Sequence, residues 1–232
     1  MKAYEHWLAL RKSILYAITG VLLVFCALVG FSQPLYTWFA DPLLRFLPEG
    51  SSLIATQVTA PFLVPLKLTF FIALCISFPY VLYQLWRFIA PGLYAAERKN
   101  ITPMICIGVV LFYLGLLFAY YVVLPLIFAF TVQSAPLGVQ VMTDISAYLD
   151  FVLAILLAFG ICFQTPLVIV GLSRLGIVNV ATLKQKRPYI IVGAFIIGML
   201  LTPPDIFSQT LLAIPLCLLF EVGIWWAGRA QP

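Results

Sequence analysis

Six apolar stretches, separated by short polar segments, dominate the pattern of hydrophobic and polar positions along the chain. They cover residues 13–31, 68–86, 103–125, 151–172, 189–201 and 206–226. A helix needs roughly 20 apolar residues to cross a hydrocarbon core about 30 Å thick. The pattern therefore predicts an all-α integral membrane protein with six transmembrane helices, built as a single membrane domain over residues 1–232.

The last two predicted helices are short. Residues 189–201 rise only about 20 Å as a helix, and the sixth stretch is purely apolar only over 206–220, before Glu221. The segment 202–205 (TPPD) separates the two helices, because adjacent prolines end a helix. Further prolines lie within or at the rims of the spans: Pro65, Pro79, Pro125, Pro166 and Pro215. They predict bent helices and a curved, concave arrangement.

Lysine and arginine fall almost entirely in alternate loops, and this distribution predicts how the helices are oriented. One side of the membrane receives 11 basic residues: Lys2, Arg11, Lys12, Arg87, Arg98, Lys99, Arg174, Lys184, Lys186, Arg187 and Arg229. The other side receives Arg45 and Lys67. Because cytoplasmic loops are enriched in lysine and arginine, both termini are expected in the cytoplasm.

The composition supports a membrane protein and excludes several functional classes. Hydrophobic residues make up 64% of the 232 residues and charged residues 9%, against about 45–50% and about 25% in soluble domains. The net charge of +5 is spread between apolar stretches, which argues against a nucleic-acid partner. His6 is the only histidine, and the five cysteines form no C-x-x-C pair. Neither a histidine-based catalytic triad within the membrane nor a metal site is therefore expected.

Two isolated carboxylates lie among basic residues near the predicted cytoplasmic face. Glu97 is the only acid in the segment 87–102, and Glu5 is the only acid before the first span. A carboxylate in this setting accepts a guanidinium through two parallel hydrogen bonds, or it is neutralised by a neighbour such as Arg98. The residues alone leave both interpretations open.

Gln164, Asp150 and Glu221 stand out among the polar residues within or at the edges of the spans. Gln164 lies midway along the fourth span, where it forms a hydrogen bond between helices or faces a water-filled cavity. Asp150 and Glu221 lie at opposite faces of the membrane, so they cannot form a pair of catalytic carboxylates, and we interpret both as interfacial anchors. The segment 32–61 is expected to form an external cap on the membrane surface.

Several long motifs resemble the TatC family, whose members are the largest core subunits of the twin-arginine protein translocase. They are HWLALRK at 6–12, IATQVTAPF at 54–62, PYVLYQLWRFIAPGLY at 79–94, FAYYVVLP at 118–125, GVQVMTDISAYL at 138–149, and KRPYIIVGAFIIGMLLTPPDIFSQTLLAIP at 186–215. Together these motifs extend over nearly the whole chain. The family's six spans, cytoplasmic termini and short last two helices agree with the predictions from hydropathy and charge.

The resemblance implies a receptor for twin-arginine signal peptides that is also a core subunit of a translocase. Such a translocase exports folded proteins across the cytoplasmic (inner) membrane of a bacterium. The resemblance also implies single-span partner subunits of the TatA and TatB types, and self-association is expected. It implies no enzymatic activity, metal, cofactor or nucleic-acid partner, and transport is driven by the transmembrane potential and the proton gradient.

Individual positions acquire roles through the same resemblance. Glu97 matches the carboxylate that receives the arginine pair, flanked by Phe88 and Arg98. Leu10 and Arg11 match the opposite wall of that site. Further matching positions lie on the concave membrane face or the external cap: Gln164, Tyr120, Pro42 and Asp205.

The chain departs from the family at two positions, where Ala9 and Gln164 stand in place of glutamates. Glu5 lies one helical turn before Ala9 and shares a helix face with it. Glu5 is therefore expected to supply the acid that is missing at Ala9. Gln164 keeps its hydrogen-bonding capacity but cannot carry a charge.

Other functional classes stay open at this point. A secondary transporter or channel for a small solute would carry inverted repeats and paired ionisable residues at the membrane midplane, and the sequence shows neither. A scaffold that assembles with its partners but binds signal peptides weakly would account for Ala9 and Gln164. An intramembrane enzyme lacks its catalytic groups.

Overall fold

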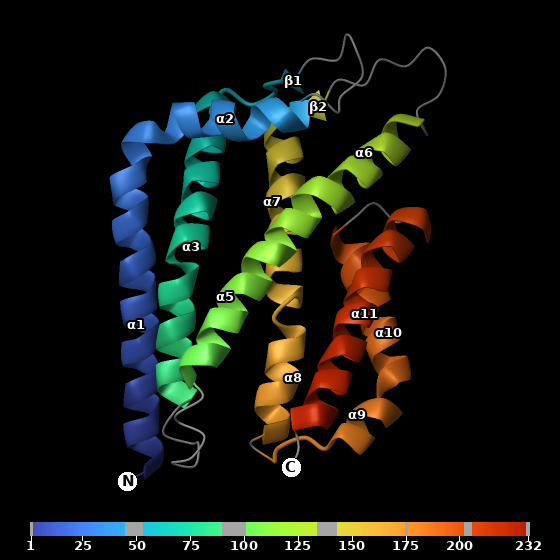
Figure 1. The fold of residues 1–232 in the computed structure, drawn as a ribbon. Coiled ribbons are helices and arrows are strands. Elements are labelled where there is room, and N and C mark those ends of the chain that lie inside the picture. The colour runs from blue at the N-terminus through green and yellow to red at the C-terminus, as the bar shows by residue number, and fades with distance from the viewer. Residues whose placement is uncertain are drawn as a thin grey trace. The chain divides into compact units, whose positions relative to one another are not determined.

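A computed structural model describes residues 2–44, 53–89, 101–133, 143–174, 176–201 and 206–230, and nearly all of them are helical (Figure 1). The elements, in chain order, are α1 (Lys2–Leu28), η1 (Val29–Phe31), α2 (Ser32–Leu44), β1 (Leu53–Ile54), α3 (Ala60–Ile89), α5 (Ile101–Phe118), η3 (Ala119–Val123), α6 (Leu124–Gln133), β2 (Thr143–Asp144), α7 (Ile145–Cys162), α8 (Thr165–Arg174), α9 (Val180–Gln185), α10 (Arg187–Leu201) and α11 (Ile206–Ala230).

Long apolar helices confirm the predicted fold class, an all-α membrane protein. Within the described parts of the chain, five helical segments are long and apolar enough to cross a membrane: Leu10–Phe39, Ala60–Arg87, Pro103–Phe130, Ile145–Arg174 and Ser208–Arg229. The helix α10, Arg187–Leu201, is a shorter sixth apolar segment. These six segments correspond in order to the six predicted spans.

The helix ends differ from those predicted by the apolar stretches. The helix α10 is short, with 15 residues, as predicted. The helix α11 has 25 residues and ends at Ala230, four residues beyond the predicted end of the sixth span. Glu221 lies inside this helix, as in the predicted span, and Arg187 of α10 pairs with its carboxylate.

Two of the predicted spans contain local breaks that precede a proline. The π-helical segment η3 interrupts the third span just before Pro125, whose missing N–H cannot bond to Tyr121 in a regular α-helix. A turn at Phe163 and Gln164 separates α7 from α8, two residues before Pro166. By contrast, α3 continues through both of its prolines.

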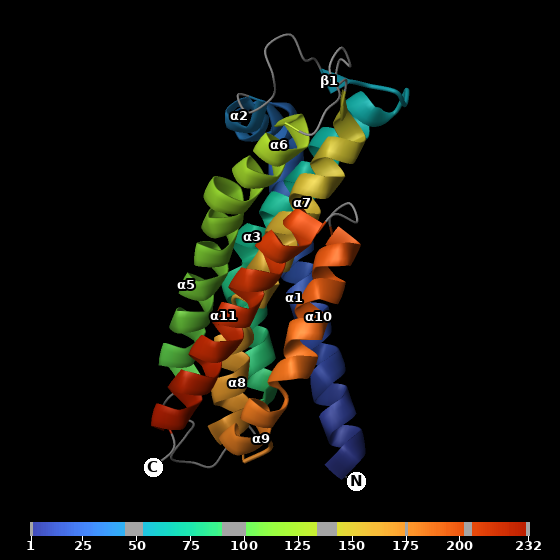
Figure 2. The same cartoon turned by 90° about the vertical axis from the view of Figure 1, so that its right-hand side faces the viewer.

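The described helices group into two compact units, which are treated separately here. The first comprises the described parts of Met1–Val109 and Val132–Leu153, and the second those of Val110–Thr131 and Ala154–Pro232. In the first unit, α1 packs along α3, and α2 lies across the end of this helix pair (Figures 1 and 2). The strands β1 and β2 form a short parallel pair, in which Ile54 is opposite Asp144.

Each unit has its own buried apolar cluster. In the first unit, α3 and α7 contribute Ala60, Val64, Leu68 and Leu149, and Tyr36 and Phe39 of α2 pack against them. In the second unit, α8 and α11 contribute Ile169, Val170, Phe220, Ile224 and Ala227, and Val180 and Leu183 of α9 pack against them. The short elements α2 and α9 therefore each cover one end of a helix pair.

Candidate functional site

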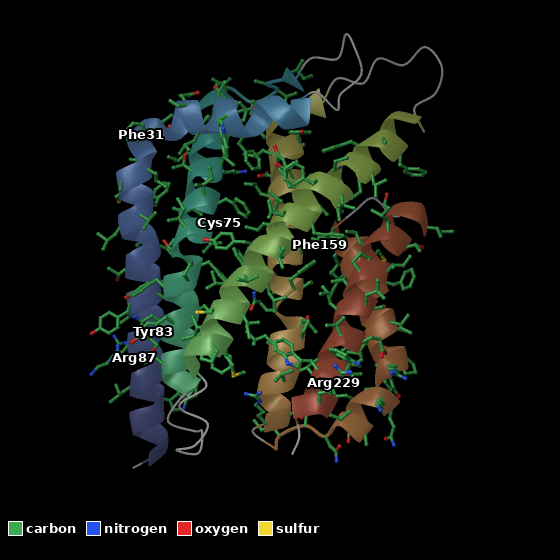
Figure 3. All side chains as sticks on the ribbon, in the orientation of Figure 1. Phe31, Cys75, Tyr83, Arg87, Phe159 and Arg229 are labelled. Carbon is green, nitrogen blue, oxygen red and sulfur yellow. The ribbon has the colours of Figure 1, made fainter. Side chains whose placement is uncertain are left out.

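The first unit brings together three of the predicted signal-peptide residues at one end of the α1–α3 pair. Leu10 is half-buried on α1, and Arg11 is exposed beside it. Phe88 lies in the last turn of α3, which ends at Ile89. Arg87 lies at the same end of α3 (Figure 3).

The placement of these residues follows from the register of the two helices. A methyl group added at Gly20 would come within 2.6 Å of the Tyr80 ring, so the backbone of α1 passes close to α3 at this level. Further along, Phe25 contacts Phe70 edge to face, with ring centroids 5.6 Å apart. Residue numbers thus rise along α1 as they fall along α3, and the two helices are antiparallel.

Leu10 on α1 and Phe88 on α3, the two predicted sides of the signal-peptide site, lie in the same direction from the contact between Gly20 and Tyr80. Leu10 is ten residues earlier on α1, and Phe88 is eight residues later on α3. At about 1.5 Å per residue, both positions are about 12–15 Å from the close contact. Their helices therefore present Leu10 and Phe88 at the same end of the first unit.

The positions of the two predicted acids, Glu97 and Glu5, follow only from their places in the sequence. Glu97 and Arg98 lie outside the described residues, in the segment 90–100 that links the end of α3 to the start of α5 at Ile101. Glu5 belongs to α1, and its side chain is not among those described. Because α1 is helical from Lys2, Glu5 and Ala9 occupy the same helix face, as the sequence predicts.

The charged side chains that the structure describes at this end of the first unit are all basic. Arg11, Lys12 and Arg87 are exposed, and none of them forms an ion pair with an acid among the described residues. Such a surface repels a cationic ligand unless carboxylates compensate the charge.

At the other end of the first unit, Asp144 ties together segments that are distant in the sequence. Its carboxylate accepts hydrogen bonds from the backbone N–H and the hydroxyl of Thr56, the former at 2.9 Å. It also caps α7 by accepting from the N–H groups of Ser146, at 2.8 Å, and Ala147, at 3.1 Å. These hydrogen bonds, that of the Thr56 hydroxyl above all, hold the pKa of Asp144 well below its usual range.

The sequence analysis gave Asp144 no role, although a signal for one was present. An aspartate directly before an apolar helix is a typical N-cap residue. Of the two predicted positions in the external cap, Pro42 is helical in α2 and its side chain is not among those described. Asp205 lies outside the described residues.

Tyr120 and Gln164 belong to the second unit. Tyr120 lies half-buried in the π-helical segment η3, with its ring 5.0 Å from that of Tyr121 and edge-on to it. Gln164 lies half-buried in the turn between α7 and α8, where its N–H donates to the carbonyl of Ile161 at 2.9 Å. Each residue predicted in the membrane therefore occupies a break in its span.

Two ion pairs correct the interpretation of Asp150 and Glu221 as simple interfacial anchors. Lys67 of α3 lies 2.9 Å from both carboxylate oxygens of Asp150 on α7. Arg187 of α10 donates to Glu221 of α11 at 2.6 Å. Both acids thus join two helices through a basic partner. Sequence reasoning missed the partners because they are 83 and 34 residues away along the chain.

Comparison with known proteins gives consistent matches over nearly the whole chain. Residues 5–215 match the family model described as Sec-independent protein translocase protein (TatC). The chain is 54% identical to the TatC protein of Haemophilus influenzae, covering 98% of this chain and 89% of that protein. It is 50% identical to the TatC protein of Escherichia coli strain K12, covering 96% and 86%.

A solved structure supports the same assignment at the level of the fold. The crystal structure of a twin-arginine translocase receptor, TatC, superposes with a TM-score of 0.87 at 34% sequence identity. The match covers 98% of this chain and 100% of the crystallised one.

Proposed function

Because this chain belongs to the TatC family of Sec-independent protein translocase proteins, we propose that it is the receptor for twin-arginine signal peptides in its translocase. As a member of this family it is a multi-pass membrane protein and a translocase component, not an enzyme. This membership decides against the alternative of a secondary transporter or channel for a small solute.

The observation that carries the proposal is the shared end of α1 and α3. Leu10 and Arg11 lie on one helix and Phe88 on the other, near the end of α3 after which the chain continues to Glu97. In the proposed complex, Glu97 accepts the guanidinium groups of the signal peptide through paired hydrogen bonds. Leu10 and Phe88 supply apolar contacts for the residues that follow the arginine pair.

The basic surroundings of the site account for its selectivity. Arg11, Lys12 and Arg87 disfavour any cationic peptide at long range, so binding depends on short contacts to Glu97 and Glu5. A guanidinium presents a planar fork of donors that matches a carboxylate, whereas a lysine ammonium is a point charge. A peptide with two arginines is therefore preferred over one with two lysines.

The orientation and partners complete the proposal. Both termini face the cytoplasm of a bacterial cell, which places the shared end of α1 and α3 on the side where precursor proteins are made. TatA-type and TatB-type subunits act with this chain in the inner membrane, and copies of the chain associate. A potential of 100 mV supplies about 2.3 kcal/mol for each charge moved across the membrane.

Site-specific photocrosslinking tests the receptor role directly. A photoreactive amino acid is placed beside Glu97 in native membranes and exposed to a labelled precursor with a twin-arginine signal peptide. We expect a crosslink with this precursor and none with a variant in which both arginines are lysines. Absence of a crosslink with either precursor, in a complex that still assembles, would contradict the proposal.

Carboxylate-to-amide substitutions then test the two acids separately. Glu97→Gln should weaken signal-peptide binding at least about tenfold, because hydrogen bonds to charged groups contribute about 1.5–3 kcal/mol. Glu5→Gln should weaken it as well if Glu5 replaces the acid missing at Ala9. Asp150→Asn, a matched change at the other end of the first unit, should leave binding unchanged. Normal binding by Glu5→Gln would refute the role of Glu5 alone.

A further inference from the structure

Gln84 on α3 carries a buried hydrogen-bond acceptor that nothing in the described part of the chain satisfies. Its side chain is only 5% exposed, and its Oε1 atom has no hydrogen-bond partner among the described residues. An unsatisfied buried polar group costs stability, and native proteins leave few of them. In a membrane the surrounding hydrocarbon offers no donor either. An acceptor kept under these conditions points to a donor that arrives from outside the chain.

The helix α3 cannot supply this donor itself. Gln84 lies inside α3, which continues to Ile89, so the backbone N–H groups around it are used within the helix. Ser77, two turns earlier, also has a buried oxygen without a partner among the described residues. A hydroxyl can rotate to donate to the backbone carbonyl four residues earlier, whereas an amide oxygen only accepts. Gln84 therefore depends on a donor from another segment.

Gln84 faces α1 and lies between a helix contact and the proposed signal-peptide site. Tyr80, Gln84 and Phe88 are spaced by four residues, so they follow one another along one face of α3. This face is directed towards α1, because a methyl group added at Gly20 would meet the Tyr80 ring. Gln84 is one turn, about 6 Å, further from the end of α3 than Phe88. It thus extends the proposed site inwards along the helix pair.

The part of α1 beside Gln84 buries few of its own side chains. Among the described side chains from Trp7 to Gly20, none is buried, and the first buried one along α1 is Val21. Ser13 and Ala17, which share a helix face with Gly20, are small. Little apolar area is therefore lost when this part of α1 moves aside, and such a movement opens a path to Gln84.

The ligand of the proposed site brings donors of the kind that Gln84 needs. A signal peptide continues from its basic part into an apolar stretch of about 7–15 residues. Where this stretch enters the membrane as a helix, its first four backbone N–H groups have no partners within the helix. Hydrocarbon cannot satisfy them. The peptide thus presents unpaired donors beyond its arginine pair, and α3 holds an unpaired acceptor one turn beyond Phe88.

We propose that Gln84 is a binding residue of the signal-peptide site and caps the first turn of the peptide's apolar helix. Its Oε1 atom accepts a hydrogen bond from one of the backbone N–H groups that follow the arginine pair. The contact requires the Leu10 end of α1 to move away from α3 when the peptide binds. Because the donor is a backbone group, Gln84 strengthens binding whatever the apolar sequence. The inference rests on the proposed receptor function and adds a contact to it.

Replacement of Gln84 by methionine separates this binding role from a structural one. Gln84→Met keeps the length of the side chain and removes both polar groups. We expect the purified chain to melt at the same or a higher temperature, because an unsatisfied buried group is lost. Binding of a labelled twin-arginine precursor to native membranes should weaken about fivefold, the contribution of one hydrogen bond. A lower melting temperature, or unchanged binding, would overturn the proposal.

Two further variants serve as controls for Gln84→Met. Ser77→Ala removes the other buried oxygen on the same face of α3 and should leave precursor binding unchanged. An equal loss of binding in Ser77→Ala would assign the effect to the packing of α1 on α3 and overturn the proposal. Glu97→Gln tests the receptor role itself. Weaker binding by Glu97→Gln, together with normal binding by Gln84→Met, would reject the role of Gln84 and retain the receptor.

Signal peptides that contain proline identify the donor. Proline lacks the backbone N–H and is accepted in the first turn of a helix, so it is placed in turn at each of the first four positions of the apolar stretch. At one position, proline should weaken binding to the unaltered chain about fivefold and have no further effect in Gln84→Met. Additive losses at all four positions would show that Gln84 accepts no backbone hydrogen bond from the peptide.

Discussion

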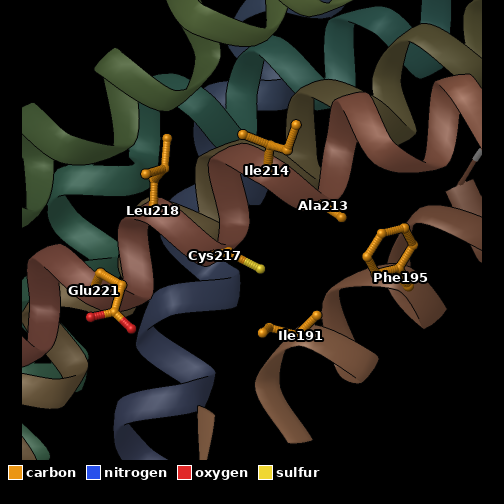
Figure 4. A pocket seen from close by; sticks show the side chains of 7 residues that line it. All are labelled: Ile191, Phe195, Ala213, Ile214, Cys217, Leu218 and Glu221. Carbon is orange, nitrogen blue, oxygen red and sulfur yellow. The ribbon is translucent and has the colours of Figure 1, made fainter. Parts of the chain in front are cut away.

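The two ion pairs between helices resemble each other in exposure but differ in what surrounds them. Lys67 and Asp150 join α3 to α7 next to the buried cluster that contains Leu68 and Leu149. Arg187 and Glu221 join α10 to α11 next to an apolar groove (Figure 4). The first pair lies where large buried side chains meet, whereas the second joins two helices that approach closely through small residues beside this exposed apolar groove.

The packing of α10 suggests that the Arg187–Glu221 pair supplies a larger share of the local stability than the Lys67–Asp150 pair does. Only Ala194 and Gly198 of this helix are buried. At the α3–α7 joint, by contrast, Leu68 is completely buried and Asp144 adds a cap and a tie to Thr56. A half-exposed ion pair contributes about 0–1 kcal/mol anywhere, so its share of the stability is larger at α10, where the buried residues are small and less apolar side-chain area is buried.

The largest expected effect comes from the packed joint. Leu68→Ala should lower the free energy of unfolding in detergent by about 2–4 kcal/mol, because it leaves a cavity between α3 and α7. Ile196→Ala on α10 removes a side chain that is 49% exposed and should change it by less than about 0.5 kcal/mol. Equal losses in the two variants would contradict the difference in packing.

The second prediction concerns the contact that α10 does make. Gly198→Val should destabilise the protein by about 1–2 kcal/mol, because its new side chain meets the backbone of Gln209, which cannot rotate away. Gly193→Val makes the same change on the same helix at a position with no atom within 4 Å. Thermal melting of the two variants should separate the clash from the shared change in helix propensity.

Removal of the basic partner sharpens the comparison further. Arg187→Gln and Lys67→Gln should each cost less than about 1 kcal/mol of global stability. Hydrogen exchange should nevertheless rise along α10 in Arg187→Gln and stay unchanged along α7 in Lys67→Gln, because clustered side chains hold α7. An equal rise in hydrogen exchange along α10 in Arg187→Gln and along α7 in Lys67→Gln would show that the two ion pairs contribute equally to local stability.

The smallest effect is expected at Asp144. Asp144→Asn keeps a good N-cap residue but loses the charge that the hydrogen bonds stabilise, so stability at neutral pH should fall slightly. Because hydrogen bonds lower the pKa of Asp144 in the folded protein, their stabilisation is present above the usual aspartate pKa and is lost as the pH falls through the lowered value. The variant should therefore lose less stability below about pH 4 than the unaltered protein, as measured by melting at several pH values.

The sequence predicted the helices well and their ends poorly, for a physical reason. Apolar stretches identify a span because the hydrocarbon core accepts few charges. Charges at the ends are accepted where a partner exists, and Lys67 and Glu221 therefore lie inside α3 and α11. Such partners come from other helices, so no local pattern reveals them.

In the candidate site, too, local sequence patterns reveal some features, whereas others depend on contacts between helices. The isolated acids Glu5 and Glu97 stand out in the sequence because everything around them is basic. That Leu10 and Phe88 share one end of a helix pair depends on the antiparallel register set by Gly20 and Tyr80. The basic residues already predict that Arg11 and Arg87 lie on one side of the membrane, but the side-by-side packing of α1 and α3 is a tertiary contact that no local pattern reveals.

The pairing of β1 with β2 has a consequence for biogenesis. Thr56 and Asp144 are separated by 88 residues, and ribosomes add about 5–20 residues per second. The segment around Thr56 is thus synthesised about 4–18 s before its partner. Two intervening apolar spans must be inserted before the tie can form. The tie therefore closes late, after the third span has returned the chain to the side where Thr56 lies.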